Sequence, residues 1–264
     1  MKTTTNYLWA ACFLLASACG NAPAKSDKQE KTPPSITIAV AANMQFAMEA
    51  LMKAFTEKTG VRCETTISSS GKLTVQIKEG APFDVFVSAD MNYPEEIFQS
   101  GLAAAPPKIY AYGKLVLWSM KENLTPSLEM LGESSIRHIA LANPKLAPYG
   151  IAAVETLKNH GLWEQVEKKL VFGESIAQTN QFIITGAAEA GFTALSVVLS
   201  DQMKGKGKWI EINQEDYPPI AQGVVVIKRK NASPHNALKF YDFLSSEEAS
   251  AILVAFGYGV DTGK

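Results

Sequence analysis

The sequence has 264 residues, of which 47% are hydrophobic and 19% charged, a balance typical of a globular protein with one large domain or two modest ones. Its 25 basic and 26 acidic residues give a formal net charge of -1. This near-neutral balance argues against a nucleic-acid-binding surface and against a polybasic membrane patch.

The N-terminal segment is strongly apolar. Residues 1–18 carry one charge, on Lys2, followed by an apolar run of about the length found in secretory signal peptides, too short for a bilayer-spanning helix. The run ends in "LLASACGN", where small residues precede Cys19. This arrangement resembles the lipobox of bacterial lipoproteins, in which the cysteine is acylated and becomes the first mature residue. We expect a lipoprotein signal peptide at 1–18, with a plain signal peptide as the alternative.

Residues 19–34 contain almost no large apolar side chains, so burial cannot offset the entropy cost of ordering them, and we expect a flexible tether. Cys12 lies in the predicted signal peptide and Cys19 would carry the lipid, which leaves Cys63 alone. An intramolecular disulfide and a cysteine metal cluster are therefore not expected.

Strand-like and helix-like segments alternate after the tether. An apolar run at 36–42 predicts a strand covered on both faces, and the next segment predicts an amphipathic helix that ends at Gly60. Residues 61–67 alternate with period two, a short helix is expected after the serines at 68–70, and 84–89 predict another buried strand. Such β-α-β crossovers imply a mostly parallel sheet with helices on both faces.

The second half of the chain repeats this alternation. The patterns predict strands and helices in turn: a strand at 138–142, helices at 151–161 and 162–170, a loop and helix within 173–191, strands at 192–199 and 223–228, and a long amphipathic helix from about Ser233 to Phe256.

Four loops follow predicted strands and precede predicted helices, namely 41–43, 68–71, 147–150 and 174–176. In open α/β sheets, ligands bind at this edge, where unpaired N–H groups of helix N-termini give partial positive charge. Serine, asparagine and glycine in these loops add neutral donors and allow close approach of the backbone, which favours a small anion. Helix capping alone remains the alternative for the serine loop.

A serine hydrolase would need a histidine base beside one of the serines. The three histidines, His138, His160 and His235, have no motif around them, and no Gly-x-Ser-x-Gly elbow is present. We expect a protein that is not an enzyme. The hydrolase stays an alternative that a histidine within hydrogen-bond reach of residues 68–70 would support.

Residues 36–90 closely resemble the N-terminal lobe of periplasmic molybdate-binding proteins, the receptors of ABC-type molybdate importers. The most specific part is the serine loop followed, at fixed spacing, by "QIKEGAPFDVFVSAD" at 76–90. The resemblance continues through 142–163 and 241–258, so that it covers nearly all of 35–260.

This resemblance implies the type II periplasmic-binding-protein fold, an α/β fold of two lobes that close around the anion. Lobe 1 would comprise 35–113 plus 222–264, and lobe 2 would comprise 114–221. Together with the lipobox, the resemblance implies a lipid-anchored monomer on the periplasmic side of a bacterial membrane, which captures molybdate or tungstate and delivers it to an ABC permease and its ATPase subunit. No cofactor and no nucleic acid are implied; sulfate, phosphate or an organic anion is the alternative ligand.

The family's motifs also imply ligand residues. A tyrosine donor of many relatives is replaced here by Ala194, so Tyr149 would take its place or one donor would be lost. Ile176 would contribute its main-chain N–H. The implied oxyanion-binding set is Asn43, Ser70, Tyr149 and Ile176, with support from Ala42, Ser69 and Ser175.

Overall fold

The computed structural model describes residues 34–230 and 234–260. The predicted signal peptide, Cys19 and the predicted tether up to residue 33 lie outside these residues. Within the described part of the chain, no helix has both the length and the apolar character needed to cross a bilayer.

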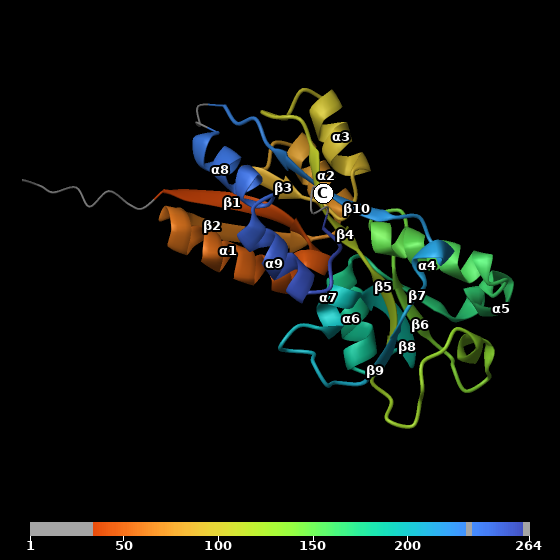
Figure 1. The fold of residues 1–264 in the computed structure, drawn as a ribbon. Helices are drawn as coiled ribbons and strands as arrows, with labels where there is room; N and C mark the ends of the chain where they lie inside the picture. Colours follow the sequence, from red (N-terminus) through yellow and green to blue (C-terminus); the bar gives the residue numbers. More distant parts are fainter. Residues whose placement is uncertain (1–33, 231–233, 261–264) are drawn as a thin grey trace, which may run out of the picture. The chain divides into compact units, whose positions relative to one another are not determined.

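The first sheet has the strand order β2-β1-β3-β10-β4 (Figure 1). Strand β1 pairs in parallel with β2 and β3, and β10 runs antiparallel to both β3 and β4, so that only β10 opposes the other strands. The strands are β1 (Ser35–Ala41), β2 (Arg62–Ser68), β3 (Val85–Val87), β4 (Lys108–Gly113) and β10 (Ile220–Val226).

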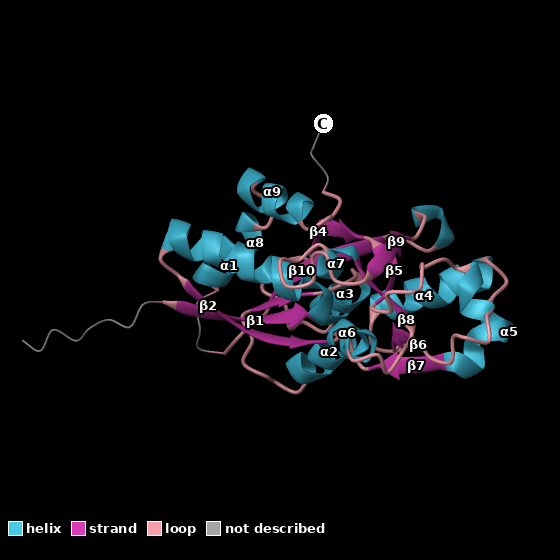
Figure 2. Ribbon diagram, turned by 90° about the horizontal axis from the view of Figure 1, so that it is seen from below, coloured by secondary structure: helices cyan, strands magenta, loops and turns pink. Residues whose placement is uncertain are grey.

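Helices cover both faces of this sheet, which explains why the β1 run is apolar at nearly every position. Ile38 and Val40 face one core with α1 (Gln45–Thr59), α8 (His235–Phe243) and α9 (Glu247–Ala255). Ala39, between them, faces the other core with α2 (Ser70–Lys78) and α3 (Asn92–Gln99). In Figure 2, α8 and α9 lie on one side of β1 and α2 on the other.

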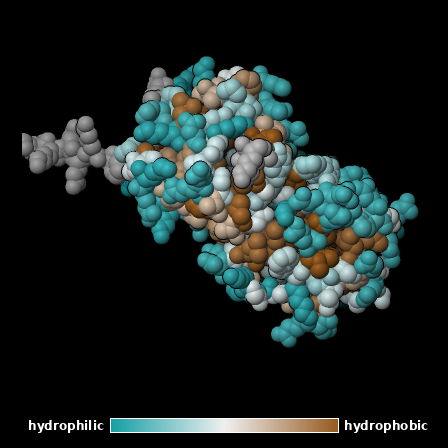
Figure 3. Space-filling view, viewed as in Figure 1, coloured by the Kyte–Doolittle hydropathy of each residue, from teal (hydrophilic) through white to brown (hydrophobic). Residues whose placement is uncertain are grey.

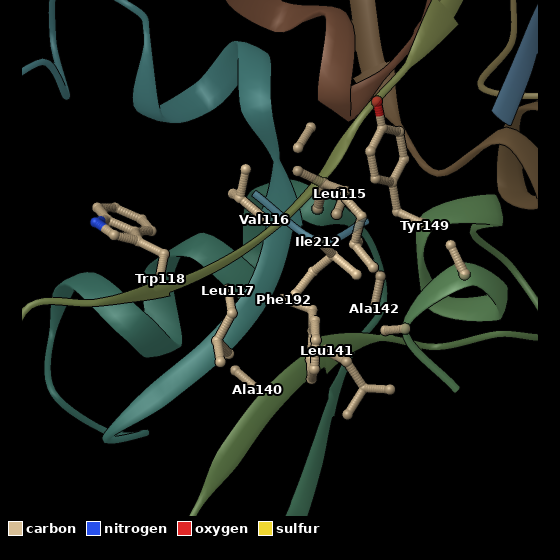
Figure 4. Close-up of a cluster of buried hydrophobic side chains, with 14 of the residues drawn as sticks. Leu115, Val116, Leu117, Trp118, Ala140, Leu141, Ala142, Tyr149, Phe192 and Ile212 are labelled. Atoms are coloured by element: carbon tan, nitrogen blue, oxygen red, sulfur yellow. The ribbon is translucent and has the colours of Figure 1, made fainter. Parts of the chain in front are cut away.

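The second sheet has the order β7-β6-β8-β5-β9, in which β6 is parallel to β7 and β8 while β5 is antiparallel to β8 and β9. Its buried side chains form the cluster of Figure 4. The strands are β5 (Leu115–Ser119), β6 (Ile139–Ala142), β7 (Leu170–Gly173), β8 (Ala190–Ala194) and β9 (Lys208–Glu211), and the helices α4 (Pro148–Asn159), α5 (Trp163–Val166), α6 (Ile176–Ile184) and α7 (Leu195–Val198).

The predicted α/β architecture, with two mostly parallel sheets flanked by helices, is confirmed. We call each sheet with its helices a lobe, the first lobe being that of β1. The chain passes to the second lobe through Lys114, between β4 and β5, and returns between β9 and β10. Most surface residues in the view of Figure 3 are hydrophilic, as expected where amphipathic helices turn their apolar sides to a core.

Two predicted elements were wrong in their bounds. The single long helix near the C-terminus is two helices, because the Ser246 hydroxyl accepts from the Ala249 N–H and caps a new helix at that point. The predicted strand at 192–199 ends at Ala194, and Leu195–Val198 form α7. A short apolar run cannot by itself distinguish a buried strand from a buried helix.

Candidate functional site

A small cavity of about 10 Å³ lies where loops of both lobes meet. Its volume is close to the room that the centre of one water molecule needs. All the residues of the predicted oxyanion set line it except Ser175. The lining residues are Ala41, Ala42, Asn43, Ser69, Ser70, Ala89, Ala147, Pro148, Tyr149 and Ile176, none of which is charged.

Ser70 is the side chain best placed to donate a hydrogen bond into this cavity. It is the first residue of α2, only 1% exposed, and its hydroxyl oxygen accepts from the Ala89 N–H at 3.0 Å. Because the oxygen is held as an acceptor, the hydroxyl hydrogen points elsewhere, and no residue in the described part of the chain accepts it. The hydroxyl is therefore oriented and still has a hydrogen to give.

The hydroxyls of Ser69 and Ser175 cap the N-termini of two helices. The Ser69 hydroxyl accepts from the Lys72 N–H at the start of α2, and the Ser175 hydroxyl accepts from the Gln178 N–H at the start of α6, both at 3.4 Å. The capping alternative for the serine loop thus applies to Ser69, whereas Ser70 lies one position further, inside the first turn.

Main-chain donors reach the cavity from four helix N-termini. Ala42 and Asn43 lie in the 3-10 turn that leads into α1, Tyr149 is the second residue of α4, and Ile176 is the first residue of α6. The N–H groups of a first turn have no partner within their helix and carry the positive end of its dipole. With α2, these termini supply positive potential without a charged side chain.

The side chain of Asn43 is engaged inside the protein and is not available to an anion. Its side-chain Nδ2 donates to Gln222 Oε1 at 2.9 Å and to the Tyr258 hydroxyl at 3.2 Å. Both amide hydrogens are therefore used inside the protein, and its main-chain N–H is the donor that it can offer to an anion.

Tyr149 is 2% exposed, and its hydroxyl oxygen accepts from Gln222 Nε2 at 3.2 Å. Figure 4 shows its ring leaving α4 with the hydroxyl turned away from the hydrophobic cluster. Burial raises the pKa of this hydroxyl well above its ordinary value, so that it stays a neutral donor at physiological pH.

A larger cavity, of about 560 Å³, lies in the second lobe, away from these helix termini. Charged side chains line it, among them Lys121, Glu133, Arg137 and Glu189. Its mixed charges and exposed rim lack the convergent donors of the smaller cavity. In the described residues, no group of three or more His, Cys, Asp or Glu side chains is placed to hold a metal ion.

The family model for bacterial extracellular solute-binding proteins matches residues 36–259. The chain belongs to this family. It is similar to the molybdate-binding protein ModA of Azotobacter vinelandii, with 39% identity over 85% of this chain and 90% of the relative. It is also similar to ModA of Rhodobacter capsulatus, with 38% identity over 84% of this chain and 87% of the relative.

Among solved structures, the periplasmic molybdate-binding protein of Azotobacter vinelandii aligns with a TM-score of 0.81 and 34% identity, covering 86% of this chain and all of that protein. The predicted resemblance to periplasmic molybdate-binding proteins is thereby confirmed.

In this solute-binding protein, contacts between the lobes border the cavity. The Gly71 N–H, in the first turn of α2, donates to the Leu146 carbonyl of the second lobe at 3.0 Å. Beside it, the Lys72 ammonium pairs with Glu174 at 2.5 Å, and both side chains of this pair are partly exposed. These contacts bring the two lobes together next to the cavity.

The sequence analysis missed the polar residues behind the site, Gln222, Ser196 and Tyr258. All three are buried, and they take part in hydrogen bonds between the solute-binding protein's lobes: Gln222 to Tyr149, Ser196 to Asn43, and Tyr258 to Ser196. The one available signal was the position of Gln222, a polar residue next to the apolar run at 223–227.

Proposed function

We propose that this protein is an extracytoplasmic substrate-binding protein that captures molybdate or tungstate between its lobes and delivers it to an ABC permease and its ATPase subunit. The names of its relatives support this class of ligand. The observation that carries the proposal is the convergence of four helix N-termini and the Ser70 hydroxyl on one uncharged cavity.

We further propose that the anion is held by the Ser70 hydroxyl and by the main-chain N–H groups of Asn43, Tyr149 and Ile176. Ala42, Ser69 and Ser175 would support these donors. A tetrahedral dianion offers several acceptor oxygens, and helix N-termini bind such groups without a cationic side chain. A buried donor left without an oxygen costs about 1–3 kcal/mol, so we expect an anion too small to reach all of these donors to bind less well.

Calorimetric titration with molybdate, tungstate, sulfate and phosphate tests the function. We expect micromolar or tighter binding of molybdate and tungstate and weaker binding of sulfate, because the smaller ion leaves donors unfilled. Hydrogen phosphate carries an O–H group that needs an acceptor, and the proposed site offers only donors, so we expect it to bind more weakly as well. If neither molybdate nor tungstate binds at micromolar concentration, the function is wrong; tighter binding of sulfate or phosphate would move the protein to the alternative ligand class.

A serine hydrolase has less support. The Ser70 hydroxyl meets a main-chain N–H instead of a base, His160 pairs with Asp216 at 3.0 Å, and His138 lies 3.9 Å from Glu189. The relatives, too, are named for binding.

For the chain outside the site, we propose a signal peptide at 1–18, a lipid on Cys19, a tether at 19–34, and a monomer on the periplasmic side of a bacterial membrane. The lobes would comprise 35–113 plus 222–264 and 114–221. In support of this division, β4 belongs to the first sheet and β5 and β9 to the second, whereas β10 of the first sheet begins at Ile220, two residues before the proposed boundary.

Mass spectrometry of protein extracted from membranes tests the anchor. We expect the N-terminal peptide to begin with an acylated Cys19, since the lipobox places cleavage directly before this residue. A mature chain with an unmodified Cys19, recovered in the soluble fraction, would contradict the lipid anchor.

A further inference from the structure

Gln222 connects two of the proposed ligand residues, one from each lobe. It lies on β10 at the point where pairing with β4 shifts register, and its side chain is fully buried. Its Oε1 accepts from the Tyr110 hydroxyl at 2.7 Å and from Asn43 Nδ2 at 2.9 Å, while its Nε2 donates to the Tyr149 hydroxyl at 3.2 Å. The side chain therefore has a partner at both ends.

The direction of these hydrogen bonds is fixed by a main-chain carbonyl. The Asn43 carbonyl oxygen can only accept, and it accepts from the hydroxyls of Ser196 at 2.8 Å and Tyr258 at 3.0 Å. The single Tyr258 hydrogen has two acceptors within reach, this carbonyl and Ser196 Oγ at 2.9 Å. With its hydrogen used on either one, the Tyr258 hydroxyl accepts from Asn43 Nδ2, so Asn43 also turns an N–H toward Gln222. The atom of Gln222 that faces Asn43 must therefore be its oxygen, which accepts this hydrogen bond. The Nε2 group of Gln222 then faces Tyr149 and donates to its hydroxyl.

This order leaves Tyr149 with a hydrogen to donate. Its hydroxyl oxygen receives the Gln222 N–H, and no residue in the described ranges accepts the hydroxyl's own hydrogen. The Tyr149 oxygen also lies directly against Gly113, so close that a Cβ added to this glycine would be 2.1 Å from it. This contact restricts the movement of the hydroxyl. Tyr149 lines the cavity, so a bound anion can serve as the missing acceptor.

We propose that Gln222 is a positioning residue for the oxyanion: by donating its N–H to the Tyr149 hydroxyl, it turns the tyrosine's hydrogen toward the bound anion. This inference rests on the proposed function. It adds a side-chain donor to the main-chain N–H of Tyr149, in a chain that has Ala194 where the resemblance would place a tyrosine donor. Because the bond joins the two lobes, this donor is oriented only while the lobes are together.

Gln222→Glu tests the proposal by changing one atom. The oxygen that accepts from Tyr110 and Asn43 is kept, while the donating nitrogen becomes an oxygen that draws the Tyr149 hydrogen to itself. In a double-mutant cycle titrated with molybdate, we expect Tyr149→Phe to weaken binding about tenfold in the native background, as expected for the loss of one donor to a charged ligand. In the Gln222→Glu background we expect no further loss from Tyr149→Phe.

Tyr217→Phe is the matched control, because the Tyr217 hydroxyl is also buried but accepts from the Leu115 N–H at 3.1 Å, outside the cavity lining. We expect it to lower thermal stability and leave affinity unchanged. If the new carboxyl prevents folding, Gln222→Met, which removes the N–H without adding charge, enters the same cycle and should likewise reduce the effect of Tyr149→Phe.

Two outcomes would overturn the role of Gln222. One is additive losses in the cycle, and the other is a native-background Tyr149→Phe variant that binds as tightly as the unaltered protein. A protein that binds none of the four oxyanions would instead overturn the proposed function. The two failures are therefore distinguishable.

Discussion

Replacing Gly71 with alanine is expected to weaken molybdate binding by about 1–3 kcal/mol, which is roughly 5- to 150-fold, through contact with the opposite lobe. A Cβ at this position would lie 2.9 Å from the Tyr93 hydroxyl and 3.1 Å from both the Cα and the carbonyl oxygen of Leu146. The backbone atoms of Leu146 cannot turn away as a flexible side chain does. The lobes would therefore have to part slightly, and the Gly71 N–H to Leu146 bond would lengthen.

The same substitution should not lower the thermal stability of the protein without ligand. Gly71 lies in α2, where alanine is favoured over glycine by up to about 1 kcal/mol. Once the lobes separate, the contact with Leu146 is lost, and the remaining close neighbour is the Tyr93 hydroxyl on α3, at the end of a side chain that can turn aside. We expect thermal unfolding without ligand to be unchanged or to occur at a higher temperature. A loss of affinity without a loss of stability is the signature of a contact made between the lobes.

Val75→Ala is the control for this variant, since Val75 lies on the same helix and is 54% exposed. Its affinity should match that of the unaltered protein. Equal affinity in the Gly71 variant would show that the contact with Leu146 does not limit binding.

The second large effect is expected at Ser70, where substitution by alanine should weaken molybdate binding by about 1–3 kcal/mol. The variant loses a buried side-chain hydroxyl whose oxygen is held by the Ala89 N–H and whose hydrogen is left to donate. It also leaves the buried Ala89 N–H without its partner, so stability should fall by about 1 kcal/mol. Calorimetry measures the first effect and thermal unfolding the second.

Ser69→Ala separates binding from capping. The Ser69 hydroxyl caps α2, so its loss should cost about 1 kcal/mol of stability and change affinity less than Ser70→Ala does. If the two variants bind molybdate equally well, and as well as the unaltered protein, Ser70 is not a ligand.

Much of the fold could be predicted because its signals are local. The apolar run of β1, the helical face of α1 and the left-handed Gly60 that ends this helix with a φ of 70° all appear in a few neighbouring residues. By contrast, β4 and β5 were not predicted. They are adjacent strands joined by Lys114 alone, and only the completed fold separates them into different sheets.

The site was predictable to the same extent. A strand, a polar loop and a helix N-terminus recur four times, and this pattern led to residues that line one cavity. How each residue contributes could not be predicted. For example, Asn43 donates its amide hydrogens to Gln222 and Tyr258, which are 179 and 215 residues further along the chain. Local sequence patterns do not reveal contacts at such separations.

The position of β10 has a consequence for the order in which the protein can fold. This strand fills the place between β3 and β4, although it follows the whole second sheet in the chain. As the chain emerges N-terminus first, the second sheet needs only residues 115–211, whereas the first cannot be complete before residue 226 has emerged. The lobe that holds the N-terminal strands is therefore the last to finish, and its final pairing is a long-range one of the kind that slows folding.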